Sequence, residues 1–224
     1  MLPGRPIRFY PALLSTEADA LAWARAGAPG GAVVAAEYQA SPRGRAGLEW
    51  HPTPGESVAF SLVLRPRLPA DREGWLYTVA AAGLADVLGP DATIEWPDEV
   101  RRGSEPWGAV GIQTGLGAAG LEWAVVNVLV RQAARARSTT VARVVEAIEH
   151  RCGERPAAVL ADYLRRCSTI GRGVRARLIP LGPGGVAITG RAVTARLDGS
   201  LVVERDDAVR IAVLPQSLGL LEEA

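Results

Sequence analysis

Residues 36–50 of the chain read Ala-Glu-Tyr-Gln-Ala-Ser-Pro-Arg-Gly-Arg-Ala-Gly-Leu-Glu-Trp. An apolar run at residues 33–36 leads into this segment and an alternating run at residues 58–64 follows it, so both flanks are predicted to be strands. Between them, Arg43-Gly44-Arg45 is predicted to lie in a loop. Glycine lets the backbone approach an anion closely, and each guanidinium offers a planar, permanently charged fork. The loop is therefore expected to bind a phosphate or carboxylate, the alternative being that its arginines brace a surface hairpin.

The composition is that of a globular chain that contains no lysine. It has 224 residues, 48% of them hydrophobic, with a formal net charge of +1, and its 25 lysine-plus-arginine positions are all arginine. A near-neutral chain with interspersed acids attracts polyanions weakly, so neither nucleic acid nor a membrane is expected as a partner. No run approaches the ~20 apolar residues of a membrane span, and the N-terminus lacks the order of a signal peptide. We expect a cytoplasmic protein.

Hydrophobic spacing predicts several further elements. A helix is expected over residues 18–24, behind Ser15 and Thr16 as capping residues. Further helices are predicted over Trp75–Leu88, residues 139–150 and Pro156–Arg166, and further strands over residues 93–100, 108–113 and 121–130. Asn127 lies inside an apolar strand and must find hydrogen-bond partners, so it faces either a ligand or the backbone.

Residues 36–50 resemble the signature of the biotin protein ligases, Glu-x-Gln-x-x-Gly-Arg-Gly-Arg-x-Gly-x-x-Trp. The matching positions are Glu37, Gln39, Arg43, Gly44, Arg45, Gly47 and Trp50. Pro42 replaces the first loop glycine, which fixes φ and removes an amide donor. The family also has a lysine, in a Lys-x-x-Gly-Ile-Leu pattern, that contacts the acid and the phosphate where the acyl adenylate forms. Residues 108–113 are the best local match, and Gly108 occupies the lysine position. The loss of that cation implies a rate lower by roughly a hundredfold or more, unless an arginine replaces it.

Three further motifs resemble motifs of the same family. Ser15 and Thr16 match a Ser-Thr-Asn motif near the bound acid, with Glu17 in place of the asparagine; a cap alone would also explain Ser15. Asn127 matches the asparagine of a Gly-Ile-Asn-Val motif. Residues 96–99 resemble Trp-Pro-Asn-Asp, in which a carboxylate would serve a metal or a ribose, the alternative being a solvated acidic turn.

The resemblance implies a set of site residues. The ligand-binding residues would be Ser15, Thr16, Gln39, Arg43, Gly44, Arg45, Gly47, Trp50 and Asn127. The catalytic positions would be Arg45 and Gly108, where the lysine is lost, and the metal ligands would be Asp98 and Glu99. ATP and Mg²⁺ are implied as cofactors, with biotin or another carboxylic acid, or an acyl adenylate, as ligand and a carrier protein as a partner.

The composition changes near Gly171. Short alternating strands are predicted at residues 174–178, 185–193, 201–204 and 209–214, separated by glycine- and aspartate-containing turns. This part resembles the SH3-like domain that follows the core of biotin protein ligases. We expect a ligase-like core over residues 1–172 and a C-terminal β module over residues 173–224. No winged-helix segment precedes the core, so a repressor role is not expected.

The expected fold is α+β, a mixed β-sheet core with flanking helices as in class II synthetases and biotin protein ligases, plus a small SH3-like barrel. Three functions remain open. The first is a divergent family member that binds a carboxylic acid or acyl-adenylate-like ligand, with biotin ligation altered or lost. The second is an active ATP-dependent biotin protein ligase, and the third is a non-catalytic binding or scaffold pseudo-ligase. The loss of the lysine at Gly108, the change at Pro42 and the acidic residues Glu17 and Glu95 favour the first. We expect Arg45→Ala to weaken the ligand with little effect on folding.

Overall fold

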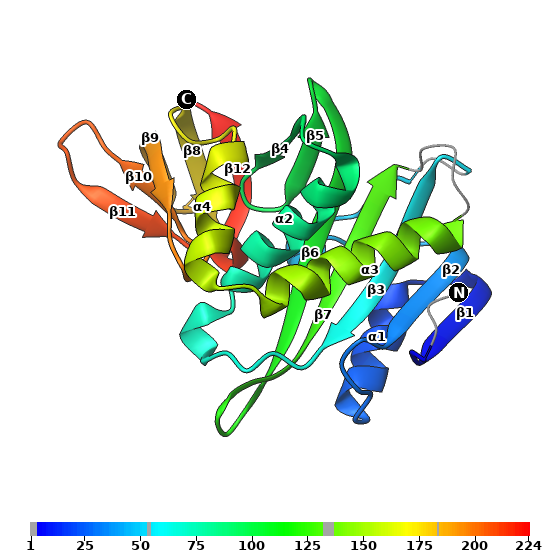
Figure 1. The fold of residues 1–224 in the computed structure, drawn as a ribbon. Coiled ribbons are helices and arrows are strands. Elements are labelled where there is room, and N and C mark those ends of the chain that lie inside the picture. The colour runs from blue at the N-terminus through cyan, green and yellow to red at the C-terminus, as the bar shows by residue number, and fades with distance from the viewer. Residues whose placement is uncertain (1–3, 53–54, 132–136, 183) are drawn as a thin grey trace.

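The computed structural model describes residues 4–52, 55–131, 137–182 and 184–224 and contains a large and a small β-sheet (Figure 1). The large sheet has the strand order β1-β2-β3-β7-β6-β5-β4. Its strands are β1 (Ile7–Leu13), β2 (Val33–Gln39), β3 (Ser57–Leu64), β4 (Ala92–Glu95), β5 (Glu99–Arg102), β6 (Glu105–Gly117) and β7 (Gly120–Arg131). β1 is parallel to β2, and the other neighbours are antiparallel. This mixed sheet with its helices confirms the expected α+β class.

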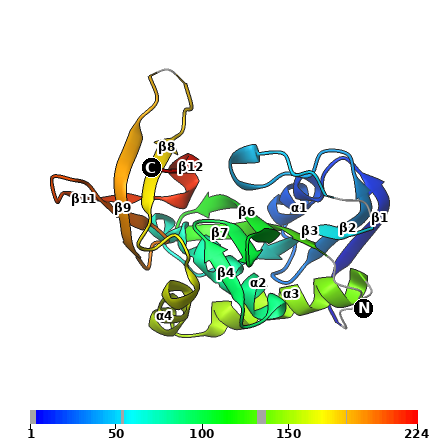
Figure 2. The ribbon, with the colours of Figure 1, turned by 90° about the horizontal axis from the view of Figure 1, so that it is seen from above.

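Helices cover both faces of the large sheet (Figure 2). The helices α2 (Trp75–Leu88) and α3 (Arg137–Gly153) lie on one face, and α1 (Thr16–Arg25) lies on the other. Side chains alternate along β3, so Phe60 joins the main core with Leu84 and Ile148, whereas Val63 joins a smaller core with Ala20 of α1. No helix in the described ranges is long and apolar enough to cross a membrane.

The small sheet is antiparallel and has the order β11-β10-β9-β8-β12. Its strands are β8 (Gly173–Leu178), β9 (Ala187–Ala195), β10 (Leu201–Glu204), β11 (Arg210–Val213) and β12 (Leu218–Glu223). It packs on the core where Trp96 Nε1 donates to the carbonyl oxygen of Gly199 at 2.9 Å. A Cβ at Gly74 would lie 2.4 Å from the carbonyl oxygen of Asp198, so this close approach of the two parts requires glycine.

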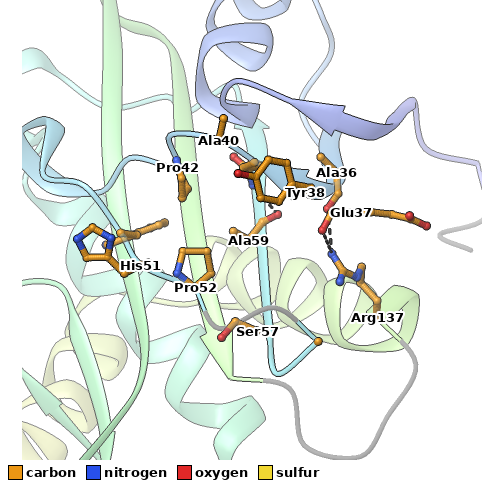
Figure 3. Close-up of a pocket in the computed structure, with 13 residues that line it drawn as sticks. Ala36, Glu37, Tyr38, Ala40, Pro42, His51, Pro52, Ser57, Ala59 and Arg137 are labelled. Atoms are coloured by element: carbon orange, nitrogen blue, oxygen red, sulfur yellow. Dashed lines mark hydrogen bonds between the residues drawn. The ribbon is translucent and has the colours of Figure 1, made fainter.

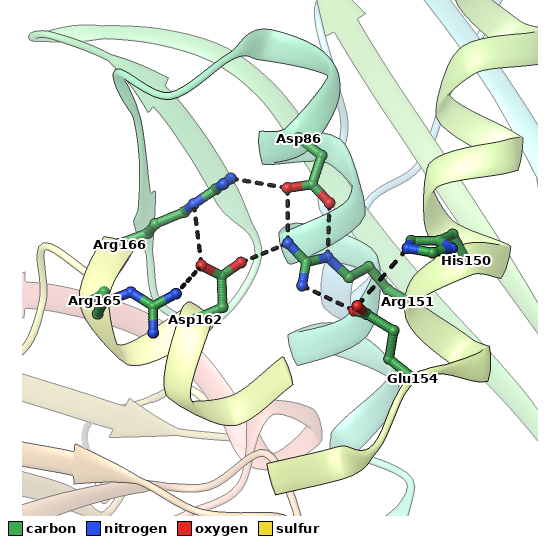
Figure 4. A network of polar contacts seen from close by, with 7 residues as sticks. All are labelled: Asp86, His150, Arg151, Glu154, Asp162, Arg165 and Arg166. Atoms are coloured by element: carbon green, nitrogen blue, oxygen red, sulfur yellow. Dashed lines mark hydrogen bonds and ion pairs between the residues drawn. The ribbon is translucent and has the colours of Figure 1, made fainter. Parts of the chain in front are cut away.

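A cluster of charges joins α2, α3 and α4 (Pro156–Arg166) (Figure 4). Arg151 of α3 donates to both carboxylate oxygens of Asp86, at 2.7 and 2.8 Å, and also pairs with Asp162 of α4. Its side chain is only 12% exposed. Because the pair with Asp86 is bidentate and largely shielded from water, it is expected to stabilise the packing of the three helices more than a surface pair would.

The helices α2 and α4 have the predicted bounds, but two strands were not predicted. Strand β1 contains Pro11; it is an edge strand, where proline is tolerated because one side of the ladder is open. Strand β12 contains Gly219 and lacks clear alternation, and it is held by pairing with β8. The small sheet therefore has five strands where the sequence predicts four. Residues 93–100, predicted as one strand and a turn, form the end of β4, the turn and the start of β5.

Candidate functional site

The loop after β2 packs against β6 through two glycines. The indole of Trp50 covers Gly44, where a Cβ would lie 2.4 Å from Trp50 Nε1. At Gly111 of β6 a Cβ would lie 2.7 Å from the carbonyl carbon of Gly44. Gly111 pairs with Asn127 of β7, so this packing places the loop beside the predicted asparagine.

Arg45 is bound inside the protein. The residue is 6% exposed, and its Nε lies 3.1 Å from Oδ2 of Asp98. Its Nη1 donates to the carbonyl oxygen of Leu218 in β12. Burial raises the pKa of the Asp98 carboxyl, and the charge of Arg45 partly offsets this rise. Arg45 thus joins the loop, the β4–β5 turn and the small sheet, which does not fit the expectation that its replacement would leave folding nearly unchanged.

Arg43 is more open than Arg45. Its Nη1 donates to the carbonyl oxygen of Gly47 at 3.0 Å, and its Nη2 lies 4.0 Å from Glu49. The Arg43 side chain is 42% exposed. A guanidinium has five N–H donors, and this geometry leaves several of them available to an anion.

A buried polar cluster lies between α1 and the sheet. Gln39 Oε1 accepts from the backbone N–H of Thr16 at 2.8 Å, and Gln39 Nε2 donates to the carbonyl oxygen of Ala59 at 2.9 Å. The hydroxyl oxygen of Ser61 lies 2.9 Å from Oγ1 of Thr16 and 2.8 Å from Oδ1 of Asn127. The structure thus brings three predicted residues, Thr16, Gln39 and Asn127, into one network. Sequence reasoning missed Ser61, although a serine in an apolar strand signals a required hydrogen bond.

Glu17 enters this network and Ser15 does not. The Ser15 hydroxyl accepts from the backbone N–H of Glu17 at 3.2 Å, which is the capping alternative. The Glu17 carboxylate accepts from Asn127 Nδ2. Burial raises the pKa of Glu17, while the hydrogen bond from Asn127 and the charge of Arg43 lower it.

The Gly108 position faces α2 and not the loop. A Cβ there would lie 2.8 Å from Cδ2 of Leu84 and 3.0 Å from the carbonyl oxygen of Leu129. Gly111 is three residues further along the strand and faces the loop, because side-chain directions alternate. The assignment of Gly108 to the lysine position stays a prediction. In this geometry a lysine side chain at position 108 would point into the layer of side chains between β6 and α2.

The two residues predicted as metal ligands have different partners. Asp98 pairs with Arg45, and Glu99 lies 2.6 Å from Nη1 of Arg101. The described residues contain no group of three or more His, Cys, Asp or Glu side chains that could hold a metal ion. The arrangement therefore does not fit a preformed Mg²⁺ site, and a metal role for these two residues stays a prediction.

A cavity of about 290 Å³ opens beneath the loop (Figure 3). Gln39 and Trp50 of the predicted site are among its lining residues, together with His51 and Arg137. The pairing of β2 with β3 ends at Ala35, so the strands separate here. Arg137 donates to the carbonyl oxygens of Ala36 and Glu37, at 3.0 and 3.1 Å, beside this gap. No motif pointed to Arg137, which follows the sheet in the chain and approaches it from α3.

No known family model matches the chain. By sequence it is similar to the bifunctional ligase/repressor BirA of Bacillus subtilis, with 33% identity over 101 residues. The protein of the same name from Bacillus spizizenii is 31% identical over 101 residues. Each match covers 43% of this chain and 31% of the relative, so the chain matches about a third of the length of these relatives.

Solved structures show a similar fold over nearly the whole chain. The biotin protein ligase from Aquifex aeolicus in complex with biotin and ATP has a TM-score of 0.74 and 16% identity, covering 98% of this chain and 99% of that one. A biotin protein ligase-like protein of unknown function from a Silicibacter species has a TM-score of 0.71 and 14% identity, covering 96% of each chain. At these identities the likeness shows the fold alone.

Proposed function

We propose that this chain, which is homologous to the biotin protein ligases and has their fold, binds a carboxylic acid or an acyl-adenylate-like ligand at the loop after β2. In this proposal biotin ligation is altered or lost. The proposal depends on the difference in exposure and pairing between the two loop arginines. Arg43 is open beside a buried polar network, whereas Arg45 is held by Asp98 and Leu218.

The binding part of the proposal rests on Arg43 and the network. Arg43 offers a permanent cation to a carboxylate or phosphate, and Gln39 lies in both the network and the cavity wall. The predicted contacts of Arg45, Gly44, Gly47 and Trp50 would then be indirect, through the shape of the loop. Ser15 would contribute only as the cap of α1.

The loss of ligation rests on the missing cations. ATP, when bound, would supply the adenylyl group that activates a carboxylate. The chain has no lysine, and Arg45 is neutralised by Asp98, so negative charge that develops during that reaction meets fewer free cations. No step is assigned to Mg²⁺. A carrier protein as acceptor and a cytoplasmic location belong to the same proposal.

The test combines calorimetry with an exchange assay. Biotin, lipoate, octanoate and ATP are titrated separately into the full chain, and the ligand that binds is retested with Arg43→Ala, which we expect to weaken binding by about 1.5–3 kcal/mol. Exchange of pyrophosphate into ATP with biotin present should be at background. If the bound acid is indifferent to Arg43, the loop is structural and the binding proposal fails.

An active biotin protein ligase is the second candidate, favoured by the convergence of Thr16, Gln39 and Asn127 in one network. Vigorous biotin-dependent exchange would establish it and would show that an arginine supplies the missing cation. The non-catalytic scaffold remains if none of the acids and no nucleotide binds.

A further inference from the structure

Glu17 is a carboxylate placed inside the polar network. It is the second residue of α1, and its side chain turns toward the sheet, where Asn127 Nδ2 donates to it. Asn127 is 2% exposed and also accepts from Ser61. The helix is already capped by Ser15, so Glu17 is not needed as a cap.

The other acid of the same helix turn behaves differently. Asp19 faces β1, where Arg8 donates to it at 3.0 Å and Tyr10 at 3.2 Å. Asp19 therefore has a cation of its own. Among the described residues, Glu17 has no ion pair within 4.0 Å, and its hydrogen-bond donor is an uncharged amide.

A partly buried carboxylate with one amide donor is incompletely compensated. Burial is the main influence on Glu17 and raises its pKa; Asn127 and the more distant charge of Arg43 offset this only in part. A cation brought to Glu17 by a ligand would supply the missing compensation. An acid without such a group would leave the carboxylate desolvated and would add a second negative charge near it.

Building on the proposed function, we propose that the ligand is an amino-carboxylic acid, with its carboxylate held by Arg43 and an ammonium group held by Glu17. The two protein charges lie in the same region, because Gly44, next to Arg43, packs on Gly111, and Asn127, which pairs with Gly111, donates to Glu17. Opposite charges at two points of one site match a zwitterion in one orientation only. Glu17 is thus a specificity-determining residue that selects against acids without an amine.

The test uses two acids that differ only in the ammonium group, 8-aminooctanoate and octanoate, titrated calorimetrically into the full chain. We expect the aminated acid to bind at least about tenfold more tightly, as a charge-assisted hydrogen bond implies. Glu17→Gln keeps the size and an oxygen that can accept from Asn127, and it should abolish the preference. Asp19→Asn is the matched control, on the same helix turn but facing Arg8 and Tyr10 of β1, and should retain it.

The outcomes separate this inference from the proposed function. Equal or tighter binding of octanoate, or a preference that survives Glu17→Gln in a variant with unchanged unfolding, overturns the inference and leaves acid binding intact. Absence of binding by both acids, biotin and lipoate overturns the inference together with the proposed function. Loss of the preference in Asp19→Asn also contradicts it, because the effect would then belong to the helix turn and not to Glu17.

Discussion

Arg45→Ala is expected to destabilise the protein, because it removes the cation from a buried ion pair. Asp98 would lose its partner at 3.1 Å, and the carbonyl of Leu218 would lose its donor. Removing one partner of a buried pair costs about 3–5 kcal/mol. The Asp98 side chain is 19% exposed, so we expect a loss of about 2–4 kcal/mol at neutral pH, or roughly 4–16 °C in Tm for a chain of this size.

The loss should depend on pH through Asp98. In the native protein burial already raises the pKa of this carboxyl, and without Arg45 it rises further. A carboxyl with a raised folded-state pKa gives stability at low pH that is lost as the pH rises through that pKa. The deficit of Arg45→Ala is therefore larger at neutral pH than at acidic pH.

Urea unfolding of the full chain at the two pH values measures this effect. Arg43→Ala, in the same loop but exposed, is the control and should change the free energy of unfolding by less than about 0.5 kcal/mol. Adding Asp98→Asn to Arg45→Ala should recover part of the loss, since it removes the unpaired charge. Equal unfolding midpoints for the two arginine variants, or a deficit that is the same at both pH values, would show that the Arg45–Asp98 pair does not stabilise the fold in this way.

Three other substitutions test the packing around the site. Gly111→Ala should push the loop off β6 and cost about 1–3 kcal/mol, with faster proteolysis of the loop as the readout; an unchanged cleavage rate would show that the close contact is dispensable. Arg151→Met should lower the free energy of unfolding in urea by about 2–4 kcal/mol, whereas Arg165→Met, whose side chain is 69% exposed, should change it by less than about 0.5 kcal/mol; similar losses in both would contradict a role for burial. Gly108→Lys should cost about 1–3 kcal/mol and gain no pyrophosphate exchange, because its side chain starts toward Leu84; a stable variant with restored exchange would show that the lysine reaches the site.

Local signals predicted the helices well. Pro156 at the first turn and the arginines at the end mark α4, and the helical spacing of small and apolar residues marks α2. Each of these helices carries a local boundary signal, Pro156 at the start of α4 and Gly89 after the end of α2. Strands β1 and β12 lack such signals, because each forms by pairing with a strand that is distant in the chain. Local sequence patterns do not predict which strand that is.

The site also has one part that the sequence predicted and one part that it did not. Motif spacing pointed to Thr16, Gln39 and Asn127, and the structure places them in one network. The pairing of Arg45 with Asp98 was not foreseen, because the two residues come from different motifs that each suggested a ligand contact. Residue type thus predicted that buried polar side chains need partners, but it did not predict that two opposite charges would pair with each other inside the protein. The ligand-binding roles of these residues stay predictions.

The pairing of opposite charges within the protein alters what the site can bind. Glu17 and Asp98 stand where the resemblance has neutral asparagines, and both lie near an arginine of the loop. Each carboxylate cancels part of the positive potential that would attract a nucleotide triphosphate or stabilise an adenylate. A ligand with one negative and one positive group loses little from this change, since each of its charges finds an opposite one. The charge balance of the loop therefore favours a zwitterionic acid over a polyphosphate.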